Sequence, residues 1–267
     1  MTDPFEDLLE PVVPVDPDPR FATRLRALLE AALLSSGGTM PDTAVQGDVV
    51  YASVWSPDAA RAGAFYSSVL GWRISADGRA VQGLSQHLGL WSSATHRTTF
   101  LSHAVSDIDA AISRVRAAGG SAEAAVQEPY GLSAECVDNQ GLPFALHQSG
   151  PVARPSSSAD GEIVYLTMFV PDSAAARDFY GSVFGWSFTP GSVADGWQVQ
   201  GPHPMFGLHG GHSSSAVLPM YAVSDVHAAV ARVRSAGGTA TDPVQMPYGI
   251  TSDCVDDQGL RFYLGQL

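Results

Sequence analysis

The chain has 267 residues, 27 acidic and 14 basic side chains, and a formal net charge of −13. This acidic excess repels phosphate backbones and anionic lipid head groups, so we expect no nucleic-acid partner and no membrane partner. No apolar run has the length of a membrane span, the N-terminus does not resemble a secretory signal, and two lone cysteines suit a reducing compartment, so we expect a cytoplasmic protein.

Residues 1–46 precede the rest of the pattern and are predicted to be a tail, a helix and a linker. Residues 1–18 are rich in proline and aspartate, which favours an extended tail. Asp18 and Pro19 can start a helix that Gly37 can end, and residues 35–46 are expected to be a linker. The apolar residues of this helix share one face, which we expect to pack on the chain's own domains or, alternatively, to bind a partner protein: Phe21, Leu25, Leu28, Leu29 and Leu33.

The remainder of the chain contains one pattern twice, in residues 47–149 and 161–267, with a linker predicted at residues 150–160. Matching positions are 114 residues apart at Trp72 and Trp186 but 118 apart at Val81 and Val199, which indicates a four-residue insertion in the second copy. Each copy is long enough to bury a core of its own, so we expect two similar domains. The two cysteines occupy equivalent positions and are expected to be buried thiols rather than a disulfide.

Each copy divides again into two modules, and each module is predicted to be a strand, a helix and three further strands. In the first module, Ser56 is a suitable helix cap, Pro57 fits the first helical position and Gly71 ends the helix. Alternating apolar residues predict the strands of this module near residues 48–55, 72–75, 79–84 and 87–91. The second module has strands near residues 99–105, 122–127, 132–137 and 143–148, and a helix that starts at Ile108.

The order of these motifs resembles the glyoxalase/bleomycin-resistance family, also called the vicinal oxygen chelate (VOC) superfamily. The resemblance rests on the Phe-Tyr-x-x-Val-(Leu/Phe)-Gly-Trp segments at residues 65–72 and 179–186, on Pro-Tyr-Gly before a late strand, and on the Val-Asp-(Asn/Asp)-Gln-Gly-Leu turns. The N-terminal extension is similar to one found on tandem, two-domain actinobacterial members. The resemblance implies an α+β fold of two tandem VOC domains, each built from paired βαβββ modules that form a curved-sheet cup.

Enzymes of this family hold a divalent metal in the cup with His, Gln or Glu side chains. The resemblance places one ligand seven residues before the aspartate that opens a helix and another seven residues after the aspartate of the last turn. Those positions here are Tyr51, Phe100, Ala145, Tyr165, Leu218 and Tyr263. None of these side chains is a good transition-metal ligand, and His209, equivalent to Trp91, would be alone. We therefore expect no metal and no other cofactor, which makes a metal-dependent glyoxalase or extradiol dioxygenase the less favoured hypothesis.

Strand alternation predicts which residues line each cup. In the first copy these are Tyr51, Ser53, Trp55, Ser102, Glu135 and His147. In the second copy they are Tyr165, Thr167, Phe169, His209, Asp253 and Tyr263. Apolar walls with a few polar groups are typical of a pocket for an organic ligand. Core packing of the aromatic residues and solvation of the charged ones are the alternative interpretations.

The leading hypothesis is a metal-free protein that binds a small, largely apolar or aromatic organic molecule, for sequestration and resistance or in a natural-product pathway. The alternative is a metal-independent isomerase, lyase or cyclase, in which Tyr51 polarises a carbonyl and His147 or Glu135 moves a proton. A third hypothesis is a scaffold whose N-terminal helix recruits a protein. Because both domains lie in one chain, we expect a monomer or a weak dimer.

Overall fold

The computed structural model describes residues 43–155 and 159–267, so the predicted N-terminal tail and helix lie outside the described residues. We call residues 47–149 the first repeat and residues 161–267 the second repeat. No helix in the described ranges is long and apolar enough to cross a membrane. Both cysteines are buried, free thiols, as the sequence predicted.

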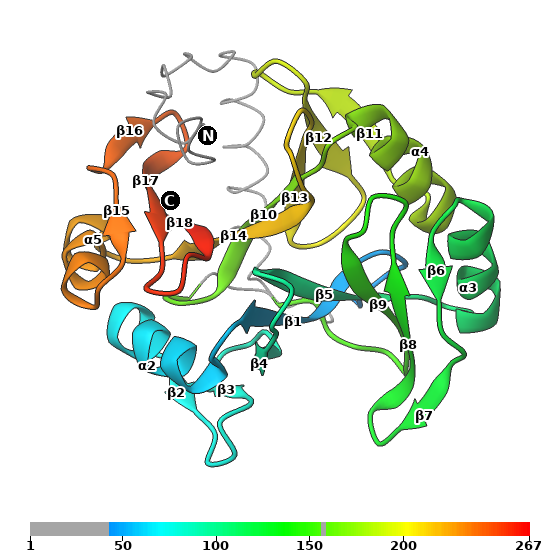
Figure 1. The fold of residues 1–267 in the computed structure, drawn as a ribbon, viewed down its shortest axis with the longest axis horizontal. Coiled ribbons are helices and arrows are strands. Elements are labelled where there is room, and N and C mark those ends of the chain that lie inside the picture. Colours follow the sequence, from blue (N-terminus) through cyan, green and yellow to red (C-terminus); the bar gives the residue numbers. More distant parts are fainter. Residues whose placement is uncertain (1–42, 156–158) are drawn as a thin grey trace, which may run out of the picture.

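The elements of the two repeats follow the same order (Figure 1). The first repeat contains β1 (Val49–Ser56), α2 (Ala59–Leu70), β2 (Arg73–Ile74), β3 (Val81–Gln82), β4 (Leu88–Ser92), β5 (Thr98–Ala104), α3 (Ile108–Ala117), β6 (Ser121–Ala122), β7 (Val126–Glu128), β8 (Gly131–Val137) and β9 (Pro143–Gln148). The second contains β10 (Ile163–Phe169), α4 (Ser173–Phe184), β11 (Ser187–Pro190), β12 (Gly196–Gln200), β13 (Met205–His209), β14 (Ala216–Ala222), α5 (Val226–Ser235), β15 (Thr239–Ala240), β16 (Val244–Met246), β17 (Gly249–Val255) and β18 (Arg261–Gln266).

Helix α2 begins two residues later than the sequence predicted. Asp58, not Ser56, is the cap: its backbone is extended and its Oδ1 accepts a hydrogen bond from the Arg61 amide at 3.0 Å. The Ser56 side chain is instead buried at the end of β1, where its hydroxyl bonds to the Asp58 carbonyl at 3.3 Å. The predicted end is right, because Gly71 adopts the left-handed conformation with φ of 73°.

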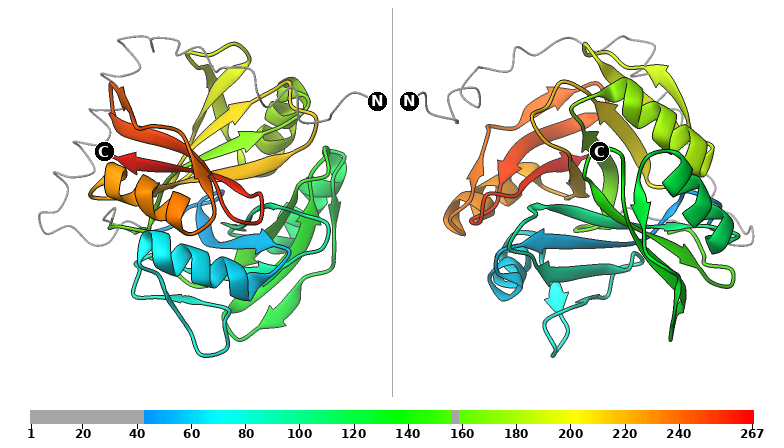
Figure 2. Two further views of the ribbon diagram at one scale, coloured as in Figure 1. Left: turned by 60° about the vertical axis from the view of Figure 1, so that its left-hand side comes forward. Right: turned by 45° about the vertical axis from the view of Figure 1, so that its right-hand side comes forward.

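Each repeat has one large curved sheet (Figure 2), and β2 and β3 of the first repeat form a separate two-stranded sheet. The strand order of the first sheet is β4-β1-β5-β9-β8-β6, and that of the second is β11-β12-β13-β10-β14-β18-β17-β15. In the first repeat the two modules join through antiparallel pairing of β1 with β5, and the second repeat uses β10 and β14 in the same way. The predicted mixed α+β fold, with two similar repeats built around curved sheets, is therefore confirmed.

The helices pack in pairs where the repeats meet, α2 beside α5 and α3 beside α4 (Figure 1). The sequence predicted one core for each repeat, but most of the buried apolar side chains form one continuous cluster that spans both. Tyr66 of the first repeat, for example, contacts Tyr221 and Phe262 of the second, with ring centroids 5.8 and 5.6 Å apart. The two repeats thus share one core.

Polar contacts across this interface occur in matching pairs. The Tyr180 hydroxyl donates to Asp138 at 3.0 Å, and the equivalent Tyr66 hydroxyl donates to Asp256 at 3.3 Å. Both aspartates belong to the turn that precedes the last strand of a repeat. In the same way Gln140 bonds to the backbone of Asp172, and Gln258 to that of Asp58. These pairs relate the repeats by an approximate internal two-fold axis.

Candidate functional site

The face of the first sheet that points away from the shared core carries the residues predicted to line the first cup. Tyr51 is paired with Ser102, Ser102 with Ala145, and Ala145 with Glu135, so these residues form a row across four strands. We call this surface the first concave face; it comprises Tyr51, Ser53, Trp55, Gly89, Trp91, Phe100, Ser102, Ser133, Glu135, Ala145 and His147. Alternate residues of β1, such as Ala52 and Val54, point into the core instead.

Aromatic side chains project from the first concave face and from the hairpin beside it. Trp55 stacks on Phe100 with ring centroids 4.5 Å apart and an interplanar angle of 3°, and its Nε1 donates to the Ser53 hydroxyl at 3.0 Å. Tyr51 and Trp91 are 38% and 48% exposed, and Tyr130, on the β7–β8 hairpin, is 65% exposed and lies 5.8 Å from the His147 ring. Exposed aromatic side chains that gather on one surface indicate a binding site.

Small side chains form the floor between these rings. Ser53, Ser102 and Ala145 are almost completely buried, and Gly89 lies beside Ser53 on β4. Of the polar residues predicted for this cup, Glu135 is exposed at the edge and His147 is half-buried. The face therefore has an apolar, hydroxyl-bearing floor and an acidic edge.

Sequence reasoning did not assign the aromatic residues Trp91 and Phe100 of this surface, or the neighbouring Tyr130, to the site. Trp91 and Phe100 were compared only with metal ligands, and Tyr130 only served as part of the Pro-Tyr-Gly motif. The alternation of β4 and β5 could have placed the first two on the same face as Trp55, since both pair with β1. No local pattern could have placed Tyr130, because its hairpin approaches the sheet only in the fold.

The equivalent face of the second sheet is occupied by larger side chains of its own. The matching row is Tyr165, Met220, Tyr263 and Asp253. Met220 is buried and packs with Tyr165 and Tyr263 in a small separate cluster. Leu218, paired with Thr167, is buried as well. Here bulky side chains stand where the first repeat has serine and alanine.

The predicted residues Phe169 and His209 lie at the other end of the second face. They are neighbours on β10 and β13, and His212 stacks on Phe169 with ring centroids 3.8 Å apart. The His209 Nδ1 and His212 Nε2 atoms are 2.6 Å apart, so one imidazole donates to the other. Burial, and then the neighbouring His209, lower the pKa of His212 to about 4. The pair is therefore a packed, hydrogen-bonded unit at neutral pH.

Burial sets the protonation states of the candidate acid–base groups. It raises the pKa of Tyr51 and Tyr165, and it raises the pKa of Tyr263 to about 12, so these phenols remain protonated hydrogen-bond donors at neutral pH. Burial lowers the pKa of His147, which favours its neutral imidazole. Burial also raises the pKa of both cysteines to about 12, so neither is a ready nucleophile.

The strand register identifies the two positions, one in each repeat, that correspond to a metal ligand of the family's enzymes and that the sequence alone did not place. Tyr51 and Phe100 are equivalent, since each lies seven residues before a helix-capping aspartate. Ser53 is paired with Gly89 as Ser102 is paired with Ala145, so Gly89 is the missing equivalent of Ala145. Trp91 and His209, which the sequence pattern places at this ligand position, each lie two residues beyond it. By the same pairing, Gly207 is the equivalent in the second repeat.

Tyrosine hydroxyls fill the space beside these glycines. A Cβ atom on Gly89 would collide with the Tyr51 hydroxyl, and a Cβ atom on Gly207 would collide with the Tyr165 hydroxyl. A coordinating side chain therefore has no room to start at either position. Within the described ranges there is also no group of three or more His, Cys, Asp or Glu side chains placed to hold a metal ion. These donors do not fit the divalent metal of the family's enzymes.

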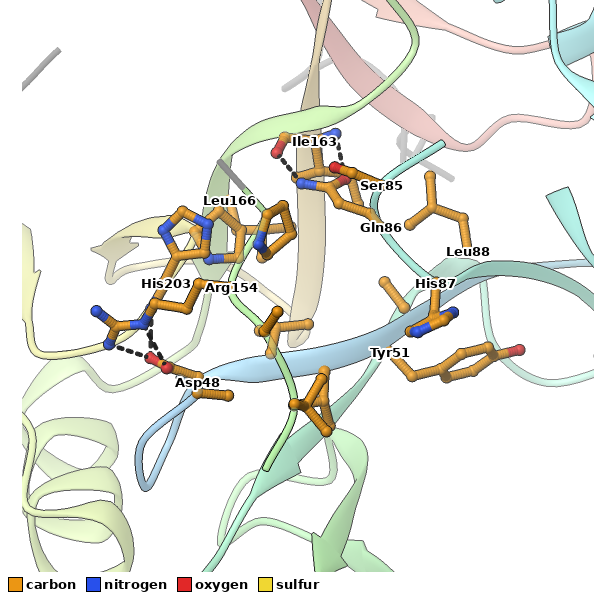
Figure 3. Close-up of a pocket in the computed structure, with 18 residues that line it drawn as sticks. Asp48, Tyr51, Ser85, Gln86, His87, Leu88, Arg154, Ile163, Leu166 and His203 are labelled. Atoms are coloured by element: carbon orange, nitrogen blue, oxygen red, sulfur yellow. Dashed lines mark hydrogen bonds and ion pairs between the residues drawn. The ribbon is translucent and has the colours of Figure 1, made fainter. Parts of the chain in front are cut away.

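A pocket of about 550 Å³, counting its open mouth, lies between the repeats and is lined in part by Tyr51 (Figure 3). Its polar walls are held by contacts within the protein. The buried Asp48 accepts from Arg154 at 2.7 Å and from the His203 amide at 2.8 Å, and Gln86 bonds to the backbone of Ile163 at 2.6 Å. These contacts join the linker and the two repeats, which is a structural role for the pocket walls.

Comparison with known proteins agrees with this architecture. The family of glyoxalase-like domains matches residues 48–147. The chain is 26% identical over 253 residues to the anthracycline biosynthesis protein DnrV of Streptomyces peucetius, covering 79% of this chain and 90% of the relative. It is 25% identical over 253 residues to the anthracycline biosynthesis protein DauV of Streptomyces sp. (strain C5), with the same coverage of 79% and 90%.

Solved structures of enzymes share the fold. The Mn(II)-bound glyoxalase from Novosphingobium aromaticivorans superimposes with a TM-score of 0.65 at 17% identity, covering 84% of this chain and 83% of that one. The halotolerant catechol dioxygenase BphC has a TM-score of 0.61 at 15% identity, with coverage of 84% and 87%. At these identities the likeness concerns the fold alone.

Proposed function

Because this chain belongs to the glyoxalase/bleomycin-resistance, or vicinal oxygen chelate, superfamily, we propose that it is a metal-free member that binds a small, largely apolar or aromatic organic molecule. The observation that carries the proposal is the replacement of the family's ligand positions. In both repeats these positions hold tyrosine, glycine or apolar residues, and a tyrosine hydroxyl lies over each glycine. The cup is therefore built for contact with organic surfaces rather than for an ion.

The relatives indicate a class of molecule. The two curated relatives are named for anthracycline biosynthesis, and anthracyclines are flat, polycyclic aromatic compounds that carry several oxygen atoms. The first concave face offers rings for stacking and hydroxyl groups for hydrogen bonds, which suits such a molecule. We propose that the protein acts in a natural-product pathway or sequesters such a product.

A ligand screen tests this proposal. A ligand present at a hundred times its Kd stabilises the folded state by about 2.7 kcal/mol, which raises the melting temperature measurably. We expect planar aromatic natural products, anthracyclines included, to raise it, and we expect treatment with EDTA to leave the increase unchanged. Stoichiometric zinc, nickel, manganese or iron in the purified protein, or a ligand response that EDTA abolishes, would contradict the proposal.

Acid–base catalysis without a metal is the second candidate function. It is favoured by the neutral imidazole of His147 beside Tyr130 and by the protonated phenol of Tyr51, which could polarise a carbonyl. Glu135 lies three strands from Tyr51, roughly 14 Å at the usual strand spacing, and His147 lies on β9, one strand nearer. The Tyr51 hydroxyl lies over Gly89 on β4, on the other side of β1, so a substrate that uses both Tyr51 and His147 would have to extend across several strands. Turnover of a bound compound that is lost in both Tyr51→Phe and His147→Gln would support catalysis; turnover unchanged in both would exclude these roles.

A further inference from the structure

We propose that the first repeat alone takes the ligand, as a flat aromatic molecule on the first concave face, and that the second repeat has become a structural half. This inference rests on the proposed function and adds to it which cup works and which residues decide it. Two independent comparisons between equivalent positions carry it. They concern the floor of each face and the exposure of its rings.

The floors differ in the size of two side chains. Ser102 and Ala145 of the first repeat are equivalent to Met220 and Tyr263 of the second, because each pair joins the corresponding parallel strands. Met220 is buried and packs with Tyr165 and Tyr263, so those side chains occupy the middle of the second face. The side chains of Ser102 and Ala145 are smaller, so they fill less of the same region of the first face.

The rings differ in their exposure. Tyr51, Trp91 and Tyr130 are the exposed large aromatic side chains of the described ranges, and all three belong to the first repeat. Their equivalents, Tyr165, His209 and Tyr248, are only partly exposed. His209 is bonded to His212, and Tyr165 packs against Met220. The rings of the second repeat are therefore largely covered by neighbouring side chains, whereas those of the first repeat stay exposed, although Arg79 lies over the Trp91 ring, 5.1 Å from its centroid.

The arrangement of the exposed rings points to a planar aromatic ligand. Trp55 and Phe100 are parallel within 3°, and Trp91 is the strand neighbour of Trp55, so a flat molecule can extend an existing stack. The Tyr51 phenol is protonated and can donate to a carbonyl or phenolic oxygen of the ligand. These groups fit an oxygenated polycyclic aromatic compound better than an aliphatic chain.

Exchange of equivalent residues provides the test. The probe is the anthracycline doxorubicin, titrated into the full chain by isothermal calorimetry and followed by quenching of tryptophan fluorescence. Ser102→Met with Ala145→Tyr gives the first face the floor of the second, and Trp91→Ala with Tyr130→Ala removes two exposed rings without opening the core. The matched control is Tyr248→Ala, the equivalent of the Tyr130 change in the second repeat.

We expect one binding site per chain, at least tenfold weaker binding in both first-repeat variants, and unchanged binding in Tyr248→Ala. Two sites per chain, or binding that survives in both first-repeat variants, would overturn the assignment to the first repeat while leaving the proposed function intact. If neither doxorubicin nor any planar aromatic compound of the ligand screen binds the unaltered protein, the proposed function fails, and this inference fails with it.

Discussion

At the scale of single residues, two glycine–tyrosine pairs determine which side chains the neighbouring strands can accommodate. Gly89 on β4 and Gly207 on β13 have no side chain. Each is covered by the hydroxyl group of a tyrosine on the strand paired with it, Tyr51 on β1 and Tyr165 on β10. The covering ring needs the glycine, because any Cβ atom there would occupy the volume of the phenol. The effects of substituting the glycine and the tyrosine on the free energy of unfolding should therefore not be additive.

Gly89→Ala is expected to destabilise the protein by about 1–3 kcal/mol, as overpacking of a tight site does, because the methyl group displaces the Tyr51 ring. The cost should be at least about 0.5 kcal/mol smaller when Tyr51→Ala is already present, since the nearest obstacle is then gone and only the closely placed Arg79 carbonyl remains. Urea unfolding of the two single variants and the double variant measures this coupling. Strict additivity would show that Tyr51 does not occupy this place in solution.

A buried histidine makes the stability depend on pH. His103 is 1% exposed, donates from Nδ1 to the Gly47 carbonyl at 2.9 Å, and packs against Phe184 and Trp186. Burial lowers its pKa from 6.5 to about 4. Between these two pH values the unfolded chain binds a proton that the folded chain does not bind, so the free energy of unfolding falls as the pH drops.

The loss attributable to His103 should be about 3 kcal/mol between pH 6.5 and pH 4, and it should be absent above pH 6.5. His103→Gln keeps a donor near the Gly47 carbonyl and cannot take up this proton. Urea unfolding at pH 7 and at pH 4 should therefore show a smaller difference for the variant than for the unaltered chain. Equal pH dependence of both proteins would mean that His103 is accessible to solvent protons in the folded state.

The turn before the last strand of each repeat receives a hydroxyl from a helix of the other repeat. Asp138 is buried, and its Oδ2 accepts from Tyr180 while its Oδ1 accepts from the amides of Gln140 and Leu142 at 2.8 Å. The second repeat repeats this arrangement with Asp256 and Tyr66. Helices α4 and α2 are therefore held by the opposite repeat as well as by their own sheet.

Tyr180→Phe should cost about 1–3 kcal/mol, because it leaves a buried carboxylate oxygen without its hydroxyl donor. Tyr221→Phe is the matched control. Its hydroxyl is also buried, but it has no hydrogen-bond partner among the described residues, so its removal should be neutral or stabilising. The melting temperatures of the two variants compare them directly; equal losses would show that the hydrogen bond to Asp138 adds nothing to the stability.

The sequence predicted the elements and their faces better than the contacts between them. Period-two alternation was enough to place Tyr51, Ser53 and Trp55 together, because their neighbours Ala52 and Val54 are apolar and buried. The role of Gly89 could not be predicted, since it depends on which residue of β4 lies beside Ser53, and register across strands is set by the whole sheet. The filling of the second face by Met220 and Tyr263 was missed for the same reason.

The shared core defines the behaviour of the whole molecule. Side chains from both repeats form one cluster, and the paired helices lie at the interface. We expect unfolding in urea to be a single transition that has the same midpoint by far-UV circular dichroism and by tryptophan fluorescence. Trp72 and Trp186 are buried reporters, one in each repeat. Two separated transitions would show that the repeats unfold independently.

The matched contacts across the internal two-fold axis have a consequence for the covalent chain. Tyr66 and Tyr180 hold the halves together through side chains rather than through the connection that follows Gly150. A backbone cut in that connection would remove no bond of either pair. The protein should therefore tolerate expression as two polypeptides that find each other and reassemble, a split form in which each fragment could be labelled or altered separately.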